Sequence, residues 1–368
     1  MNSHILELAT ALRHELHAMP ELSGHEIRTK RRLQEFLRAH SSLEITDRGA
    51  WFFAFRKGGD AKAPIAFRAE MDAIAMDETI ALPYASATPG VSHKCGHDGH
   101  CAALAALALE TEQLPADRDI YFIFQHAEET GQGGQECAAL LKEKGIAEVF
   151  AFHNMAGLER GTVAIRSGTM NCASQGLILR FTGVPAHASL PETGKTPALA
   201  VADLIRVIAD LTAPGTYPAP VWCTVIQVAL GSENFGIAAG EGSVLLTCRG
   251  EREADMQRLS DRIIAAAQDF ARRDGLALEL AFRDVFPETV NHPEAADAIR
   301  AACKKLGYPR YEMPEPMRAS EDVGHFFKAA KGALFLLHSG DRPAIHTPEY
   351  DFDDSIIERA VELFKALI

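Results

Sequence analysis

The chain has 368 residues, which is long enough for two domains with large buried cores. Its formal net charge of −13 argues against nucleic acid or an anionic membrane surface as the main partner, because both attract basic patches, and it favours a small molecule. With no signal-peptide pattern, no apolar run long enough to span a membrane and seven scattered cysteines, the sequence predicts a cytoplasmic protein with reduced thiols.

The first predicted element is a helix that begins near residue 26. Ser23 is followed three residues later by Glu26, a spacing typical of a capping box, in which each side chain binds the backbone N–H of the other residue. An apolar stripe follows, made of Ile27, Leu33, Phe36 and Leu37. We expect this part of the chain to be scaffold.

Continuous apolar runs recur further along the chain. Such runs are typical of parallel strands that are buried on both faces of a sheet. They are found at residues 64–67, 120–124, 149–152 and 333–337. Helices are expected at residues 101–109 and 136–142, so the sequence predicts an α/β fold with helices on both faces of a mixed, mostly parallel sheet. Ligands of such sheets gather beyond the carboxyl ends of the strands.

Between the third and fourth of these runs the pattern changes. The expected elements lie, in order, at residues 176–181, 197–211, 222–230, 243–249, 254–273 and 276–282. Their order, strand–helix–strand–strand–helix–strand, is that of the ferredoxin-like plait. We therefore expect a small α+β domain at residues 174–284, inserted between the two parts of the α/β domain at residues 1–173 and 285–368.

The strongest local signal is the sequence His-Lys-Cys-Gly-His-Asp-Gly-His at residues 93–100. Cys95 and His97 are two residues apart, and at a helix start this spacing can direct a thiolate and an imidazole to one point. Together these groups suit a borderline metal ion such as zinc. A buried thiol beside a capping histidine is the plain alternative, so further ligands are needed to favour a metal.

Further ligands follow the ends of two buried runs. Glu128 and Glu129 come just after residues 120–124, and adjacent carboxylates can divide their roles, with one binding metal and the other acting as general base. An exposed acidic loop is the alternative for such a pair. His153 comes directly after residues 149–152, so a third loop offers a ligand.

The C-terminal stretch adds His338 and His346. Their spacing alone does not decide between them, since a histidine beside a buried strand is often only hydrogen-bonded. Five ligands from cysteine, histidine and glutamate, with a further carboxylate, would specify a two-metal hydrolytic centre in which the metal ions lower the pKa of a shared water. The predicted reaction is hydrolysis.

Seven motifs, in this order, resemble the two-metal amidohydrolase and peptidase family of aminoacylases, hippurate hydrolases and auxin-conjugate hydrolases. They are His-Ala-Met-Pro-Glu-Leu-Ser at residues 17–23, Phe-Arg-Ala-Glu-Met-Asp-Ala at 67–73, Cys-Gly-His-Asp at 95–98, Gln-His-Ala-Glu-Glu at 125–129, His-Ala-Ser-Leu-Pro at 187–191, Ser-Glu-Asp at 320–322 and His-Thr-Pro-Glu-Tyr-Asp-Phe at 346–352. The resemblance covers nearly the whole chain. It implies cleavage of the amide bond of a small N-acylated amino acid with two divalent ions, of zinc, manganese, cobalt or nickel.

The resemblance also implies residue roles. The metal shell would consist of Cys95, as the bridging thiolate, with His97, Glu129, His153 and His346. Glu128 would be the general base, and Asp72 would orient a metal-binding histidine from outside the shell. His187 matches a histidine that stabilises the tetrahedral oxyanion, although from the residues alone a structural turn histidine is the better reading. The inserted domain would form the lid and the interface of a homodimer.

The chain departs from the family pattern at several positions. Glu70 stands where many relatives have aspartate, and residues 236–239 read Gly-Ile-Ala-Ala where they have Asn-Val-Ile-Pro. Arg249, which would help to hold a substrate carboxylate, is kept, and Asn234 lies two residues early. Substrate identity is therefore left open by the sequence.

Three other functions compete with this reading. A dipeptidase or carboxypeptidase would use the same centre with different substrate recognition. A non-catalytic binding protein would be expected to lack Glu128 or a metal ligand, and the chain lacks neither. A thiol redox role for Cys95 is disfavoured because no Cys-x-x-Cys motif accompanies it.

Overall fold

The protein is described by a computed structural model that covers all 368 residues. The chain divides into two compact units. Unit 1 consists of Met1–Met170, Thr289–Pro316 and Asp322–Ile368, and unit 2 consists of Asn171–Glu288 and Met317–Glu321. None of the helices combines the length and the apolar character that a membrane crossing requires.

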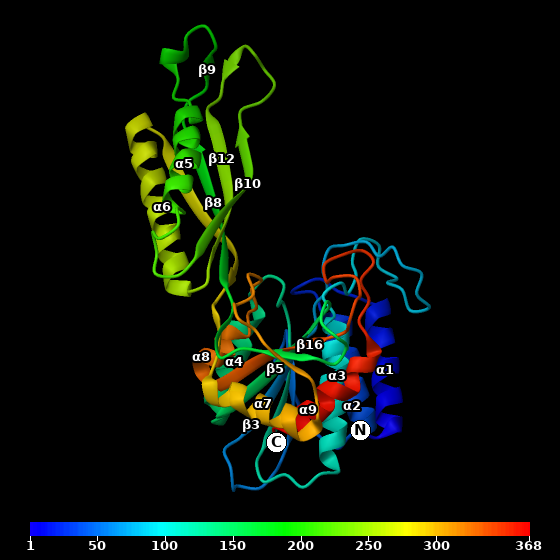
Figure 1. The fold of residues 1–368 in the computed structure, drawn as a ribbon. Coiled ribbons are helices and arrows are strands. Elements are labelled where there is room, and N and C mark those ends of the chain that lie inside the picture. Colours follow the sequence, from blue (N-terminus) through cyan, green and yellow to red (C-terminus); the bar gives the residue numbers. More distant parts are fainter. The chain divides into compact units, whose positions relative to one another are not determined.

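Unit 1 is built on one mixed sheet (Figure 1). Its strands are β1 (Glu44–Asp47), β2 (Phe52–Arg56), β3 (Ile65–Glu70), β4 (Ile120–Gln125), β5 (Glu148–Met155), β6 (Val163–Ile165), β15 (Arg310–Glu312) and β16 (Lys331–His338). They follow the order β1-β2-β4-β3-β5-β16-β6-β15. The run β4-β3-β5-β16 is parallel throughout, which confirms the four strands expected from the apolar runs. Strands β7 (Gly168–Asn171) and β14 (Thr289–Asn291) form a separate ribbon.

Helices cover both faces of this sheet, as expected. They are α1 (Ser3–Ala18), α2 (Ile27–His40), α3 (His97–Glu112), α4 (Gly133–Lys144), α7 (Pro293–Leu306), α8 (Gly324–Ala329) and α9 (Ile357–Lys365). On one face, the Phe364 ring of α9 lies 4.8 Å from the ring of Phe67, and α9 contacts α3. On the other face, Phe326 of α8 lies 6.0 Å from the Arg68 guanidinium, and α8 contacts α4.

Helix α3 is longer than expected and almost completely buried. It begins at His97, so the second half of the motif at residues 93–100 is already helical. Every residue from His97 to Thr111 is buried, which is typical of a helix that is apolar on all sides. Gly99 lets the helix approach its neighbours, since a Cβ there would lie 2.4 Å from the Phe352 ring. The start of α3 is thereby fixed against the C-terminal segment.

The predicted capping box at the start of α2 is wrong. Glu26 occupies the N-cap position, but no side chain caps this helix from there, and Ser23 and Glu26 bind other loops, described below. The carboxylate of Glu21 takes over the task, because it accepts the N–H groups of Arg28 and Thr29 in the first turn. Ile27 is 74% exposed and does not belong to the apolar stripe.

Unit 2 has the expected strand–helix–strand–strand–helix–strand order. Its main elements are β8 (Ala173–Thr182), α5 (Ala198–Leu211), β10 (Val221–Leu230), β12 (Glu241–Gly250), α6 (Glu253–Asp274) and β13 (Ala277–Phe286). The antiparallel sheet has the order β10-β12-β8-β13, and both helices lie on one face of it (Figure 1). Leu177, Leu179 and Phe181 of β8 pack with Leu204 of α5 and Leu259 of α6 in its core.

A small ribbon extends this unit. It pairs β9 (Ala186–His187) with β11 (Ile237–Ala238), and His187 lies opposite Ile237. A short 3₁₀ turn, η1 (Pro191–Thr193), follows β9, and a second, η2 (Asp354–Ile356), precedes α9 in unit 1.

Candidate metal centre

Five side chains that were expected to bind metal come together in unit 1 from four separate segments. They are Cys95 and His97 at the start of α3, Glu129 after β4, His153 on β5 and His346 in the loop after β16, here called the metal-ligand cluster. Ligand atoms lie within 4.8 Å of one another in each of the groups Cys95–His97–His153, Cys95–Glu129–His346 and His97–Glu128–Glu129. Cys95, His97 and Glu129 each belong to two of these groups, so the three groups overlap.

A glycine allows Cys95 and His97 to converge. Gly96 has a φ of +98°, in the left-handed region, and a Cβ there would lie 2.4 Å from Asn154 Oδ1 and 2.7 Å from the Tyr350 hydroxyl. Glycine is therefore needed both for the turn and for the close approach. The turn leaves Cys95 Sγ 3.3 Å from His153 Nε2.

Asp72, at the end of β3, orients two members of the cluster. The Nδ1 atom of His97 lies 2.9 Å from the Asp72 carbonyl oxygen and 3.2 Å from its carboxylate. Nδ1 is therefore assigned the proton, which leaves Nε2 as the nitrogen that could bind a metal ion. Asp72 also accepts the N–H of Glu129 and the hydroxyl of Ser23, at 2.9 and 2.8 Å. Burial favours the neutral acid, but the hydrogen bond and charge of His97 outweigh it and lower the pKa of Asp72 to about 2.

The neighbouring Glu128 and Glu129 have different surroundings. Glu129 Oε1 lies 3.4 Å from His346 Nε2 and 3.9 Å from His97 Nε2. Burial acts to raise the pKa of Glu129, but the two imidazoles prevail and lower it. Glu128 has its Oε2 3.9 Å from His97 Nε2, and its Oε1 accepts the N–H of Asp322 at 3.4 Å. Glu129 is therefore placed between two imidazoles, and Glu128 lies between His97 and the backbone of Asp322.

His346 is held in an unusual backbone conformation by Lys94. Its φ is +59°, and its N–H donates to the Lys94 carbonyl oxygen at 2.6 Å. The Lys94 side chain is fully buried, donates to the Tyr350 carbonyl oxygen at 2.7 Å and forms an ion pair with Glu78. Lys94 thus connects the segment of Cys95 with the segment of His346, a role that its place in the sequence did not indicate.

A buried polar chain behind the cluster was also missed by sequence reasoning. His100, one helical turn after His97, contacts Glu70 Oε2 through Nδ1 at 2.7 Å and Asn154 Oδ1 through Nε2 at 2.6 Å. Burial, with the nearby His153 and His97 acting in the same direction, holds the pKa of His100 well below its usual value. The only available signal was the last histidine of the motif at residues 93–100. Glu70, which replaces the aspartate of many relatives, supplies the carboxylate that reaches it.

Not every expected residue belongs to this group. His338 lies in no ligand group and contacts the backbone of Ala156 and Leu158. Three residues lie in unit 2, whereas the metal-ligand cluster belongs to unit 1. The first, His187, is exposed, and its Nδ1 atom lies 2.8 Å from Ser189 Oγ. The second, Asn234, is also exposed and accepts the N–H of Gly236. The third, Arg249, donates to Arg318 O and Ser320 Oγ, each at 2.9 Å.

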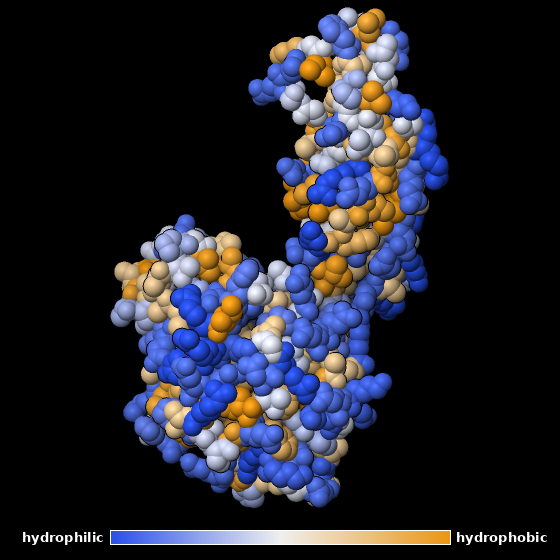
Figure 2. Space-filling view, turned by 180° about the vertical axis from the view of Figure 1, so that it is seen from behind, coloured by the Kyte–Doolittle hydropathy of each residue, from blue (hydrophilic) through white to orange (hydrophobic).

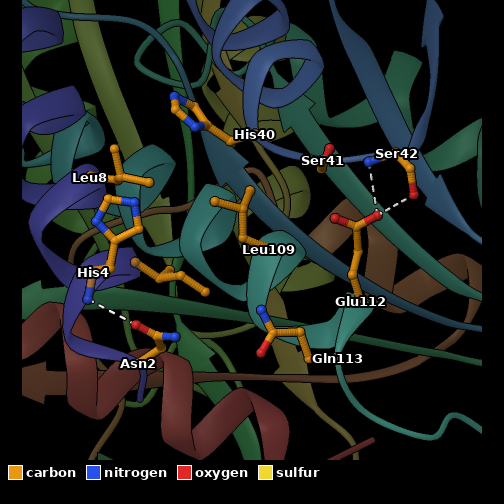
Figure 3. A pocket seen from close by; sticks show the side chains of 10 residues that line it. Asn2, His4, Leu8, His40, Ser41, Ser42, Leu109, Glu112 and Gln113 are labelled. Atoms are coloured by element: carbon orange, nitrogen blue, oxygen red, sulfur yellow. Dashed lines mark hydrogen bonds between the residues drawn. The ribbon is translucent and has the colours of Figure 1, made fainter.

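A separate cavity of about 560 Å³ in unit 1 contains histidines and a carboxylate but no residue of the cluster. Its lining includes His4, His40 and Glu112 (Figure 3). Glu112 turns towards Ser42, whose N–H and hydroxyl it accepts at 2.8 and 2.5 Å. The ionisable groups of this cavity therefore do not form a second ligand group.

Comparison with known proteins identifies the family. The sequence model of peptidase family M20/M25/M40 matches residues 66–368, which confirms the resemblance carried by the motifs. Hippurate hydrolase of Campylobacter jejuni is 28% identical over 370 residues, which cover 97% of this chain and 94% of that protein. N-acetyldiaminopimelate deacetylase of Exiguobacterium sibiricum is 26% identical over 370 residues, which cover 97% and 98%. The hydrolase class expected from the sequence agrees with both.

Solved structures show the same fold. A dinuclear metal-binding peptidase of the M20 family from Bacillus subtilis superposes with a TM-score of 0.83 at 23% identity, and the match covers 100% of this chain and 98% of that one. Aminopeptidase PepT from Bacillus cereus superposes with a TM-score of 0.74 at 15% identity, with 99% and 98% covered. Both relations extend over the two units of the chain.

Proposed function

Because the chain belongs to peptidase family M20/M25/M40, we propose that it is a two-metal amidohydrolase that releases an amino acid from a small N-acylated substrate. The observation that carries the proposal is the position of Cys95, which is shared by two groups of possible ligands. The names of the relatives support the substrate class, since hippurate hydrolase and N-acetyldiaminopimelate deacetylase are both named for N-acyl amino acids.

The residues present fit two divalent ions. One group offers a thiolate and two imidazoles from Cys95, His97 and His153, and the other offers the same thiolate with Glu129 and His346. This mixture of sulfur, nitrogen and carboxylate ligands suits zinc, cobalt, nickel or manganese better than calcium or magnesium. When bound, such ions supply the positive charge that makes water nucleophilic at neutral pH and polarises a carbonyl group.

Glu128 is the general base of the proposed reaction. It is 5% exposed, its Oε2 atom lies 3.9 Å from His97 Nε2, and its Oε1 atom accepts the N–H of Asp322. Its carboxylate would take a proton from the attacking water and pass it to the nitrogen of the departing amino acid, so that one residue serves both halves of the hydrolysis.

Unit 2 would supply recognition of the rest of the substrate. Arg249, with Asn234 in the exposed loop after β10, would hold the free carboxylate of the amino acid, because a guanidinium group can bind a carboxylate through two parallel hydrogen bonds. His187, on the exposed ribbon of β9 and β11, would donate a hydrogen bond to the oxyanion of the tetrahedral intermediate.

The proposed enzyme is a homodimer that associates through unit 2. Strand β10 lies at the edge of its sheet, and it exposes Val225, Ile226, Val228 and Leu230. Apolar side chains also recur on the surface of this unit in the space-filling view (Figure 2). An edge strand with unpaired backbone groups and exposed β-branched residues is suited to pairing with a second chain.

A substrate screen tests the function. The protein, stripped of metal and reloaded in turn with zinc, manganese, cobalt or nickel, is assayed on N-acetyl, N-benzoyl and N-indole-acetyl amino acids and on dipeptides. We expect hydrolysis of one of the N-acyl amino acids. Activity on dipeptides alone would instead make the enzyme a dipeptidase, and activity on none of these compounds with any metal would contradict the proposal.

A further inference from the structure

Glu26 is buried beside the loop that carries Glu128 and Glu129, although it is distant in sequence. Glu26 is only 4% exposed and lies in the short connection between α1 and α2. Its Oε1 atom accepts the N–H of Ala127 at 2.7 Å, across 101 positions of the chain. The carboxyl group therefore acts on the segment after β4 and not on its own helix.

Ala127 is the point at which that segment changes direction. Its φ is +48°, a left-handed conformation that residues with a Cβ adopt rarely. Its carbonyl oxygen accepts the N–H groups of Gln132 and Gly133, at 3.1 and 3.2 Å, so the chain returns on itself immediately after the two glutamates. The N–H of Ala127 has its partner in Glu26, and the unusual conformation is held from both sides.

Two carboxylates thus hold this loop, one on each side of Glu128. Asp72 accepts the N–H of Glu129, and Glu26 accepts the N–H of Ala127. The segment that contains Glu26 contributes to both contacts, because the hydroxyl of Ser23 donates to the same oxygen of Asp72. The side chains of Ser23 and Glu26 therefore act on the loops around the candidate metal centre, although the backbone carbonyl of Glu26 still accepts the N–H of Lys30 at the start of α2.

We propose that Glu26 is a positioning residue, which fixes the backbone of Ala127 and thereby aims the carboxylate of Glu128. This role rests on the proposed function, in which Glu128 is the general base. Proton transfer requires the base to lie within hydrogen-bond reach of its proton, and a small displacement of a catalytic group can greatly reduce the rate. The expected loss is therefore in turnover and not in substrate binding.

The contact at Ala127 needs an acceptor oxygen at the right distance but not a negative charge. Burial, with repulsion from Asp72 acting in the same direction, raises the pKa of Glu26 to about 7. A neutral carboxyl group still has an oxygen that can accept an N–H. The amide of glutamine has the same length and the same acceptor, whereas the carboxylate of aspartate is one methylene shorter. Substitution of Glu26 by glutamine therefore removes the charge and keeps the length of the side chain, whereas substitution by aspartate keeps the charge and shortens the side chain.

The matched control is Glu21, a carboxylate of the same connection that also accepts backbone N–H groups. Its partners are Arg28 and Thr29 at the start of α2, at 2.8 and 2.9 Å. The Glu21 side chain bonds to Arg28 and Thr29 and to no residue of the loop 126–133, so Glu21→Ala should lower stability without changing that loop. A purely structural role for Glu26 would make the two alanine variants behave alike.

The experiment compares kcat, KM, metal content and hydrogen–deuterium exchange in four variants. We expect Glu26→Ala and Glu26→Asp to lower kcat by about 10-fold or more at unchanged KM and metal content, and Glu26→Gln to stay within about 3-fold of wild type. Exchange in residues 126–133 should rise in the first two variants only. Glu21→Ala should lower the melting temperature but keep kcat.

The outcomes separate this role from the proposed function. If the wild type hydrolyses none of the N-acyl amino acids, the proposed function fails, and exchange in residues 126–133 still tests the contact. Unchanged exchange in both Glu26→Ala and Glu26→Asp would overturn the role of Glu26. So would equal losses of kcat in Glu26→Gln and Glu26→Asp, or a loss of kcat in Glu21→Ala as large as that in Glu26→Ala. If Glu26→Ala does not fold, the comparison of Glu26→Asp with Glu26→Gln decides.

Discussion

The thiol of Cys95 is shared by two ligand groups, so its loss should affect more than one ion. We expect Cys95→Ser to lose at least one of two bound metal ions per chain, because a hydroxyl is a much weaker ligand than a thiolate for these metals. Elemental analysis by mass spectrometry measures the metal content. Cys101→Ser is the control, since Cys101 is also buried but donates to the Glu70 carbonyl oxygen and belongs to no ligand group. A Cys95→Ser protein that kept two ions and full activity would show that the sulfur is not a bridge.

The adjacent glutamates should respond differently to the same substitution. Glu128→Gln is expected to keep the metal content and the fold but to reduce turnover by roughly 100-fold or more, the usual scale for the loss of a general base. Glu129→Gln is expected to lose metal, because Glu129 is placed between His346 and His97. Metal analysis and kcat on the same preparations make the comparison. If both variants retained their full metal content, the proposed difference in role between Glu128 and Glu129 would be refuted.

His17 should make stability depend on pH. Burial works against its charge, but hydrogen bonds to Asp98 and Glu78 prevail and raise the pKa of His17 to about 9. Since this exceeds the usual value, the stabilisation is fully present below a pH of about 6.5 and is lost as the pH rises through about 9. Between pH 6 and pH 9.5 the free energy of unfolding, measured with urea, should fall by about 1–3 kcal/mol, and His17→Gln should largely remove this fall. If the free energy of unfolding of His17→Gln fell by the same amount, groups other than His17 would cause the pH dependence.

At the scale of elements, the segments that the sequence predicted best are those whose pattern is local. Strands β3 and β4 are buried at every residue, so an unbroken apolar run was a sufficient signal. The start of α2 was misjudged for the opposite reason. Ser23 and Glu26 have the spacing of a capping box, but their partners Asp72 and Ala127 lie 49 and 101 positions away. No local pattern contains such partners.

Four of the candidate metal ligands, Cys95, His97, Glu129 and His153, could be picked out because they follow an apolar run or stand at the start of a helix, where α/β sheets place their functional groups. The fifth, His346, was preferred to His338 only through the resemblance to the family. Lys94 and His100 could not be assigned in the same way. Lys94 joins the segments of Cys95 and His346. His100 joins Glu70 to Asn154. Both depend on which loops meet in space, and this is decided by the whole sheet.

Strand β12 carries a prediction about the substrate. Arg249 uses one nitrogen, Nη1, for Arg318 O and Ser320 Oγ, which orients the guanidinium group. We expect Arg249→Ala to raise KM about 10-fold or more for an N-acyl amino acid, on the scale of a lost charge-assisted hydrogen bond. The corresponding N-acyl amino acid amide, which lacks the carboxylate, is the control substrate. Equal kcat/KM values for acid and amide in the wild type would refute recognition of a carboxylate.

At the scale of the whole molecule, the proposed site takes residues from both units, since His187 lies in unit 2 and the metal-ligand cluster in unit 1. We expect the enzyme to be a homodimer in which His187 serves the metal centre of the partner chain. Its loss should lower turnover by about 100-fold or more, the scale for one oxyanion donor, and leave metal content unchanged. The measurement mixes His187→Ala with Glu128→Gln, because one site of a mixed dimer would keep both residues.

Partial activity should return as subunits exchange in that mixture. Mass spectrometry of isotopically labelled chains establishes that exchange has taken place, and unmixed samples of each variant give the baseline. Complete exchange with activity still at that baseline would show that His187 acts within its own chain or has no part in catalysis.

The position of β16 has a consequence for how the protein is made. This strand lies between β5 and β6 in the interior of the sheet, but it is synthesised after all other strands, and His346 follows it. On a ribosome, the stretch Asn171–Glu288 emerges as one piece and can fold before the sheet of unit 1 is complete. Until β16 is made, the edge of β5 that pairs with it has no partner strand in this sheet. Synthesis that stops short of β16 would remove an interior strand of the sheet and the proposed ligand His346 together, so we expect an incomplete product to lose both the complete sheet and the proposed metal centre.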